Sequence, residues 1–175
     1  MIELVITAVG PDRPGLVEQL TGAVFDAGGN VADSRMVNLR GQFALLLLAE
    51  APDPPAADRI EKQAAEAARA ANLHLTVVRQ PHRDAPAAEG LPLRLRASAV
   101  DKPGIVHQLS KALHEMGVNI EQLTTTLEPA SYAAPPVFNV DMTVTVPRDI
   151  PVRKLREHLT RLGDDLNCDI VIEPT

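Results

Sequence analysis

The sequence contains one long internal repeat, and this repeat restricts the possible folds more than any other feature. Residues 12–17 read DRPGLV, and 89 residues later residues 101–106 read DKPGIV. The offset then holds without a gap up to Val31 and Ile120, and nine of these 20 positions are identical. Ordinary residue frequencies would give about one or two identities over this length. The period is that of a small domain, so the repeat predicts two copies of one structural unit.

The segment between the copies has the composition of a linker. Residues 80–90 read QPHRDAPAAEG, which is rich in Pro and Ala and has no apolar periodicity. We therefore expect a first domain over residues 1–80, a linker over 81–90 and a second domain over 91–175.

Both copies predict the same order of elements. In the first copy, apolar patterns predict strands at 3–9, 31–39, 42–49 and 73–79. Pro14 is expected at the first position of a helix that ends at Gly28, and a second, Ala-rich helix is expected after Pro54 and Pro55, up to about Ala71. In the second copy we expect strands at 93–100, 120–127, 137–146 and 169–173, with helices at 104–116 and 152–166.

This order, β-α-β-β-α-β twice, predicts an α+β protein of two ferredoxin-like domains in tandem. Each domain would have a four-stranded antiparallel sheet with both helices on one face. The turn between the two middle strands is short in the first copy, at Arg40-Gly41, and longer in the second copy, over residues 128–136.

Composition and charge exclude several classes of function. Residues 1–90 carry 8 basic and 12 acidic side chains (−4), and residues 91–175 carry 9 and 11 (−2). Aromatic residues make up 2% of the chain. Neither half therefore has the basic surface or the aromatic faces of a nucleic-acid-binding protein, and an anionic membrane surface is also disfavoured. A single cysteine, Cys168, excludes an internal disulfide and a cysteine-based metal site.

The start of the chain predicts where the protein resides. Residues 1–6 lack the basic region and cleavage site of a signal peptide, and the longest apolar run, 43–49, is too short to cross a bilayer. We expect a cytoplasmic protein.

The identical residues concentrate at the turn from the first strand into the first helix, and at the Asn that follows this helix. A helix N-terminus presents free N–H groups and the positive end of the helix dipole, which favour an anion such as a carboxylate. Asp12 and Asp101 are candidates to cap the helix or to hold an ammonium group, and Asn30 and Asn119 offer a donor and an acceptor. Such a set suits a free amino acid. The same residue types also serve purely as caps, turns and packing positions, and spacing alone favours that structural explanation.

The motif Asp-x-Pro-Gly-[Leu/Ile]-Val, followed by Gly-x-Asn-[Val/Ile] within β-α-β-β-α-β, resembles the ACT domain, a small-molecule-sensing module of amino-acid metabolism. The resemblance covers nearly the whole chain, once in each half. A pair of such domains with no attached enzyme is most similar to the glycine cleavage system transcriptional repressor group. That resemblance implies a response to glycine and action through a partner regulator.

The resemblance also implies ligand-binding positions, because ACT domains place ligands at interfaces between domains, beside the Pro-Gly turn. The positions of this sequence that match are Asp12, Arg13, Pro14, Gly15, Leu16, Val17 and Asn30, then Asp101, Lys102, Pro103, Gly104, Ile105, Val106 and Asn119. The copies differ at one point, because Gly28-Gly29-Asn30 stands where the second copy has Gly117-Val118-Asn119. The two sites therefore need not have equal shape or affinity.

Three classes of function are compatible with these features. The leading hypothesis is a non-enzymatic regulatory protein that binds a small amino acid of the glycine or serine class and signals to a protein partner, a transcription regulator. The first alternative is an ACT module that binds no ligand and serves only interaction or oligomerisation. The second is an enzyme, disfavoured because no titratable cluster recurs in the repeat. We expect no catalytic residue, no cofactor and no metal site, since His107 and His114 have no third ligand at a recognisable spacing.

The sequence also predicts self-association. Residues 43–48 read FALLLL, which is apolar on both faces of a strand, whereas a strand with one solvated face alternates. One face would meet the helices of its own domain and the other face must meet something else. We expect a homodimer, with pairing inside the chain as the alternative.

Overall fold

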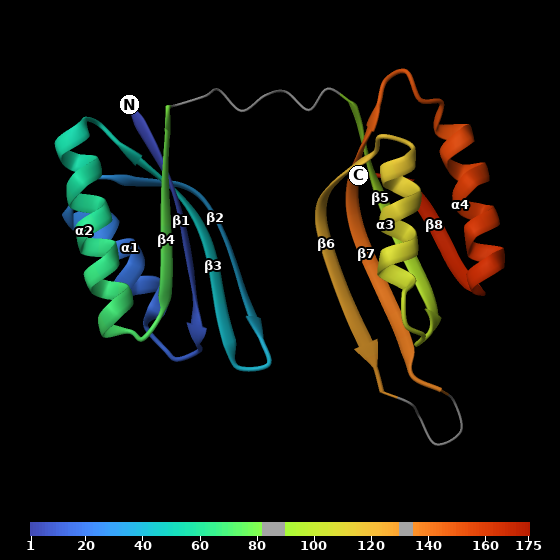
Figure 1. The fold of residues 1–175 in the computed structure, drawn as a ribbon, viewed down its shortest axis with the longest axis horizontal. Coiled ribbons are helices and arrows are strands. Elements are labelled where there is room, and N and C mark those ends of the chain that lie inside the picture. The colour runs from blue at the N-terminus through green and yellow to red at the C-terminus, as the bar shows by residue number, and fades with distance from the viewer. Residues whose placement is uncertain (82–89, 130–134) are drawn as a thin grey trace. The chain divides into compact units, whose positions relative to one another are not determined.

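The computed structural model describes residues 1–81, 90–129 and 135–175, and it divides the chain into two compact units, Met1–Asp84 and Ala85–Thr175 (Figure 1). Most of the predicted linker, 81–90, and the middle of the predicted long turn, 128–136, lie outside the described residues. The predicted domain limits and the form of that turn therefore stay predictions.

The first unit has the predicted order of elements. Its elements are β1 (Ile2–Pro11), α1 (Leu16–Asp26), β2 (Asn30–Leu39), β3 (Gln42–Ala51), α2 (Pro54–Ala70) and β4 (His74–Pro81). The strands form one antiparallel sheet in the order β2-β3-β1-β4, and α1 and α2 lie together on one face of it (Figure 1).

The second unit repeats this arrangement. Its elements are β5 (Gly90–Val100), α3 (Ile105–Glu115), β6 (Asn119–Glu128), β7 (Val137–Pro147), α4 (Val152–Leu166) and β8 (Cys168–Pro174). The strand order is β6-β7-β5-β8, again antiparallel, with α3 and α4 on one face (Figure 1). Both sheets and both helical layers confirm the predicted α+β fold of two ferredoxin-like domains.

Each unit has its own hydrophobic core between sheet and helices, made mainly of aliphatic residues. On β1, Leu4, Ile6 and Ala8 point into the core while the residues between them face the other side of the sheet. The Ala-rich helix α2 contacts the core through Ile60 and four buried alanines, so small side chains let it lie close to the sheet. None of the helices among the described residues is long and apolar enough to cross a membrane.

One local prediction was wrong. Pro14 does not occupy the first position of α1, because Gly15 stands at the N-cap with a left-handed backbone (φ 92°) and the helix begins at Leu16. The second unit is the same, with Gly104 (φ 97°) before Ile105. A residue with a Cβ atom is sterically strained at such angles, so the turn requires the glycine of the Pro-Gly pair. The expected end of the first helix at Gly28 is confirmed by the left-handed backbone of this residue (φ 83°), and Gly117 has the same conformation in the second unit (φ 67°).

Candidate ligand-binding site

The repeated motif forms two equivalent turns, which we call the first Pro-Gly turn (residues 12–17) and the second Pro-Gly turn (residues 101–106). Each follows one of the two central strands of its sheet and leads into a helix that returns along the face of the sheet. The first four residues of each turn are exposed. The motif therefore lies at the surface, at one end of each domain.

Both turns present an uncapped helix N-terminus. The first intrahelical hydrogen bond of α1 runs from the N–H of Gln19 to the carbonyl oxygen of Gly15 (3.0 Å), and that of α3 runs from Gln108 to Gly104 (2.9 Å). Within the described part of the chain, no side chain caps either helix. In contrast, the Asp53 carboxylate caps α2 by accepting from the N–H of Ala56 (2.7 Å). The Pro-Gly turns thus keep the free N–H groups and the positive dipole end that attract an anion.

The two helix starts differ in charge. Glu18 places a negative charge in the first turn of α1, whereas the first turn of α3 contains no acidic residue. Arg13 and Lys102 provide one exposed positive charge beside each turn. A carboxylate approaching the second turn therefore meets no nearby acidic side chain from the helix, and the second turn is electrostatically the more favourable for an anion.

Leu16 and Ile105, which the resemblance included among the ligand positions, point their side chains into the two cores and are almost fully buried. Only their backbone N–H groups belong to the turn surface. Val17 is partly exposed, and Val106 packs against the core of its domain. The apolar residues of the motif thus mainly hold the turn against its own domain.

Asp12 takes part in a closed set of hydrogen bonds. Its N–H donates to the carbonyl oxygen of Gly41 (2.9 Å), and its carboxylate accepts from the Asn38 amide. The amide oxygen of Asn38 in turn accepts from the N–H of Gly41 (3.2 Å). This arrangement ties the first Pro-Gly turn to the β2–β3 hairpin. Asp12 therefore does not cap α1, and its carboxylate already has a partner.

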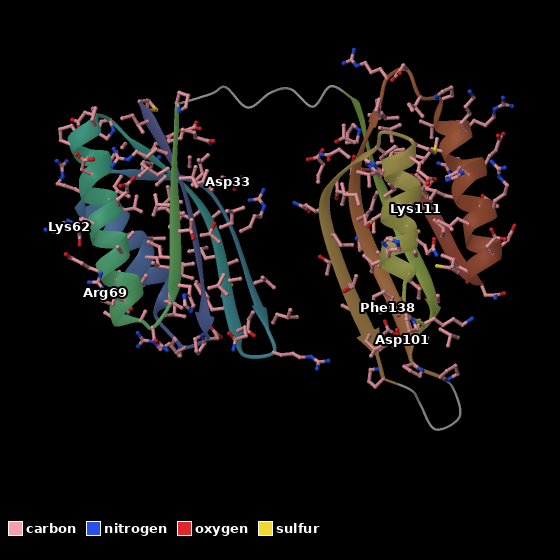
Figure 2. All side chains as sticks on the ribbon, in the orientation of Figure 1. Asp33, Lys62, Arg69, Asp101, Lys111 and Phe138 are labelled. Atoms are coloured by element: carbon pink, nitrogen blue, oxygen red, sulfur yellow. The ribbon has the colours of Figure 1, made fainter. Side chains whose placement is uncertain are left out.

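Asp101 keeps the backbone part of this arrangement but not the side-chain part. Its N–H donates to the carbonyl oxygen of Pro136 (3.1 Å), which stands where the first domain has Gly41. The strand register places Leu127 at the position of Asn38, because Asn38 pairs with Phe43 and Leu127 pairs with Phe138. Among the described residues no side chain bonds the Asp101 carboxylate, which lies at the same end of the domain as Phe138 (Figure 2).

Asn30 and Asn119 do not join these turns within their own domains. Asn30 pairs in register with Glu50, whereas Pro11, just before Asp12, pairs with Gln42. Eight residues of strand separate Glu50 from Gln42, about 26 Å at 3.3 Å per residue. In the second domain Asn119 pairs with Thr145, and its amide donates to the Glu121 carboxylate (2.7 Å), which lowers the pKa of Glu121. A free amino acid at a turn cannot also reach the asparagine of the same domain, because the intervening helix carries the chain to the opposite end of the sheet.

The difference between Gly29 and Val118 is explained by packing. A Cβ at Gly29 would lie 2.6 Å from Cδ1 of Ile60 and 3.1 Å from the carbonyl oxygen of Glu50, so α2 approaches the chain closely there. In the second domain the Val118 side chain is buried and fills the corresponding space. The predicted difference between the two copies therefore concerns helix packing.

Two residues with a role near these sites were not singled out from the sequence. Asn38 holds Asp12, and Arg59 on α2 donates from Nε and Nη2 to the carbonyl oxygen of Ala27 (3.2 and 3.1 Å), at the end of α1. Both partners lie more than 25 residues away in sequence. The repeat gives no signal for Asn38, because the second copy has Leu127 instead.

The remaining candidates for chemistry form no site in the part of the chain that the structure describes. No group of three His, Cys, Asp or Glu residues is placed to hold a metal ion there. Burial raises the pKa of the Cys168 thiol, which stays protonated at neutral pH and packs in the second core. Among the described residues, the arrangement provides two helix N-termini with free N–H groups and one carboxylate, that of Asp101, with no side-chain partner.

Comparison with known proteins gives the same family for the first copy of the repeat. Residues 3–78 match the family model of the ACT domain. The glycine cleavage system transcriptional repressor of Escherichia coli (strain K12) is 24% identical over 165 residues, covering 94% of this chain and 86% of the relative. A UPF0237 protein of Methanopyrus kandleri is 36% identical over 73 residues, covering 42% of this chain and 76% of that protein.

A solved structure matches the fold over the whole chain. The crystal structure of an unknown protein from Galdieria sulphuraria superposes with a TM-score of 0.85 at 26% identity, covering 100% of this chain and 99% of the other. A similarity that extends over both halves indicates that the relative also contains two such units.

Proposed function

The chain belongs to the ACT domain family, and from this premise we propose that it is a regulatory protein that binds a small amino acid at its Pro-Gly turns. The observation that supports this most strongly is the pair of exposed, uncapped helix N-termini, each preceded by a left-handed glycine. We expect the ligand to be of the glycine or serine class, because a small amino acid offers a carboxylate and an ammonium group and little side chain.

The ligand would use its two charged groups separately. Its carboxylate would accept from the free N–H groups at the start of the helix, where the dipole also favours it. Its ammonium group would bind a carboxylate of the turn. Asp101 suits this role better than Asp12, whose carboxylate already accepts from Asn38. We therefore propose that the second Pro-Gly turn binds more tightly than the first.

Binding of the amino acid would be signalled to a protein partner. A relative that aligns over most of this chain is named as a transcriptional repressor, which supports a regulatory role and a transcription regulator as the partner. Direct contact with nucleic acid is disfavoured by the net charge of −6. Transmission requires that the ligand bind one arrangement of the protein better than another, since equal affinity for both would shift nothing.

Isothermal titration calorimetry of the full chain against the twenty amino acids tests this function. We expect saturable heat with glycine or serine and none with large side chains. Asp101→Asn should weaken the binding at least tenfold, because it removes the charge that holds the ammonium group, while Asp12→Asn serves as the matched control and should have a smaller effect. Absence of heat with all twenty amino acids would contradict the proposal.

One observation favours the alternative of a ligand-free interaction module. In the first domain, Asp12, Leu16 and Gly15 are each accounted for by the structure of the turn itself. If calorimetry detects no ligand, the Pro-Gly turns would serve only to shape the ends of the domains, and the chain would act by assembly with a partner.

A further inference from the structure

The two domains differ in the residue that the hairpin strand places next to the aspartate of the Pro-Gly turn. In the first domain this residue is Asn38, whose side-chain amide donates to the Asp12 carboxylate. In the second domain the strand register gives the corresponding position to Leu127. Asparagine and leucine both branch at Cγ and are similar in size. The two domains therefore differ at this position in hydrogen bonding and hardly in shape.

The Asn38 amide is held in one orientation by the hairpin. Its oxygen accepts from the N–H of Gly41 (3.2 Å), and its nitrogen therefore faces the Asp12 carboxylate. The carbonyl oxygen of Gly41 also accepts from the N–H of Asp12 (2.9 Å). The amide thus presents the positive end of an N–H dipole to the carboxylate, as the ammonium group of an amino acid would.

The second domain lacks both parts of this arrangement. The carbonyl oxygen that accepts from the N–H of Asp101 belongs to Pro136 (3.1 Å), and proline has no N–H that could orient a side-chain amide. Leu127 is 50% exposed and has no hydrogen-bonding group in its side chain. This position therefore offers Asp101 no donor that would compete with a ligand.

We infer that Asn38 is an internal competitor for the ammonium group of an amino acid at the first Pro-Gly turn, and that Leu127 leaves the second turn without such a competitor. This inference rests on the proposed function and names the residues that set the relative affinities of its two sites. A carboxylate accepts more than one hydrogen bond, so Asn38 weakens the first site without closing it. The net contribution of one such hydrogen bond corresponds to about a two- to tenfold change in affinity.

The two turns therefore fill at different concentrations of the amino acid, and the second turn fills first. At the first turn the ligand competes with the Asn38 amide for Asp12. The same amide is bonded to Gly41, so this competition reaches the tip of the β2–β3 hairpin. Occupancy of the first turn is thus sensed outside the ligand site, whereas the second domain has no corresponding side-chain connection among its described residues.

Titration of the ¹⁵N-labelled full chain with glycine, followed by nuclear magnetic resonance, measures the two turns separately. The backbone amide signals of Leu16 and Val17 report the first turn, and those of Ile105 and Val106 report the second. We expect the second turn to saturate at a lower glycine concentration. The side-chain amide signal of Asn38 should shift with the same midpoint as the first turn, because the ligand competes for its acceptor.

Two substitutions exchange the residues of the two domains. Asn38→Leu should lower the midpoint of the first turn by about two- to tenfold, because it removes the competing donor. Leu127→Asn should raise the midpoint of the second turn, by a smaller factor because Pro136 cannot orient the new amide. Leu39→Asn is the matched control. Leu39 follows Asn38 on the same strand but faces the other side of the sheet, so this change should leave both midpoints unaltered.

The possible outcomes separate this inference from the proposed function. If both turns saturate but neither exchange variant moves a midpoint, or if the control moves the first midpoint as Asn38→Leu does, the inference is wrong and the proposed function stands. If neither the natural chain nor any variant saturates at a turn, the proposed function fails and the inference fails with it. Asn38 and Leu127 are exposed and belong to different units, so if circular dichroism shows that one variant fails to fold, the other still tests the inference.

Discussion

Asp12 and Asp101 are identical in the repeat but have different partners. Asp12 accepts from the Asn38 amide, whereas the position of Asn38 is Leu127 in the second domain, where the side chain has no hydrogen-bonding group. Two aspartates that align in the repeat therefore need not have the same structural role. Its role depends on what the neighbouring hairpin presents to it.

This difference predicts unequal effects on stability. Asp12→Ala removes the acceptor of Asn38 and should lower the free energy of unfolding of its domain by about 0.5–1 kcal/mol. Asp101→Ala removes a carboxylate that no side chain among the described residues bonds, and it should change stability by less than about 0.5 kcal/mol. Urea unfolding followed by circular dichroism measures both. A larger loss for Asp101→Ala would show that the second turn depends on a contact of this carboxylate.

Two helices contain an interior glycine, and the reasons for the two glycines differ. Gly22 lies in α1, and the nearest atom to a Cβ there would be Oε1 of Glu18 at 4.0 Å. Gly163 lies in α4, where a Cβ would be 2.6 Å from the carbonyl oxygen of Cys168. Helix propensity alone treats the two positions alike. The close approach of β8 to α4 separates them.

The Gly22→Ala and Gly163→Ala variants are therefore expected to have opposite effects. Gly22→Ala should stabilise its domain by about 0.5–1 kcal/mol, because alanine loses less conformational entropy in a helix. Gly163→Ala should destabilise its domain by about 1–3 kcal/mol, because the backbone of β8 must move to admit the methyl group. Thermal unfolding of the two variants beside the natural sequence gives both signs. Stabilisation by Gly163→Ala would contradict the packing described for α4.

The start of the first helix shows which feature of an element the sequence pattern does not predict. A proline before an apolar helical pattern usually occupies the first helical position. Here the next residue is a glycine with a left-handed backbone, and the helix begins after it. The pattern locates the helix within two residues, but the backbone angle of Gly15 decides whether the turn is capped by a side chain or left open.

For the whole molecule, the fold was predictable because the repeat requires both halves of the chain to have the same fold. Two copies with one order of elements leave few arrangements, and the apolar periodicities of β1 and of the helices identify the faces that form each core. The site was less predictable. The residues Asp12 and Asn30 belong to the same repeated motif, but α1 lies between them and places them at opposite ends of the sheet.

The central claim is that a small amino acid binds with its carboxylate at the start of a helix beside a Pro-Gly turn. Nuclear magnetic resonance of the ¹⁵N-labelled full chain during titration with glycine tests this most directly. We predict saturable shifts of the amide signals of Ile105 and Val106, because these N–H groups face the carboxylate, with smaller shifts at Leu16 and Val17. Unchanged turn signals at saturating glycine, or shifts confined to residues away from both turns, would contradict the account.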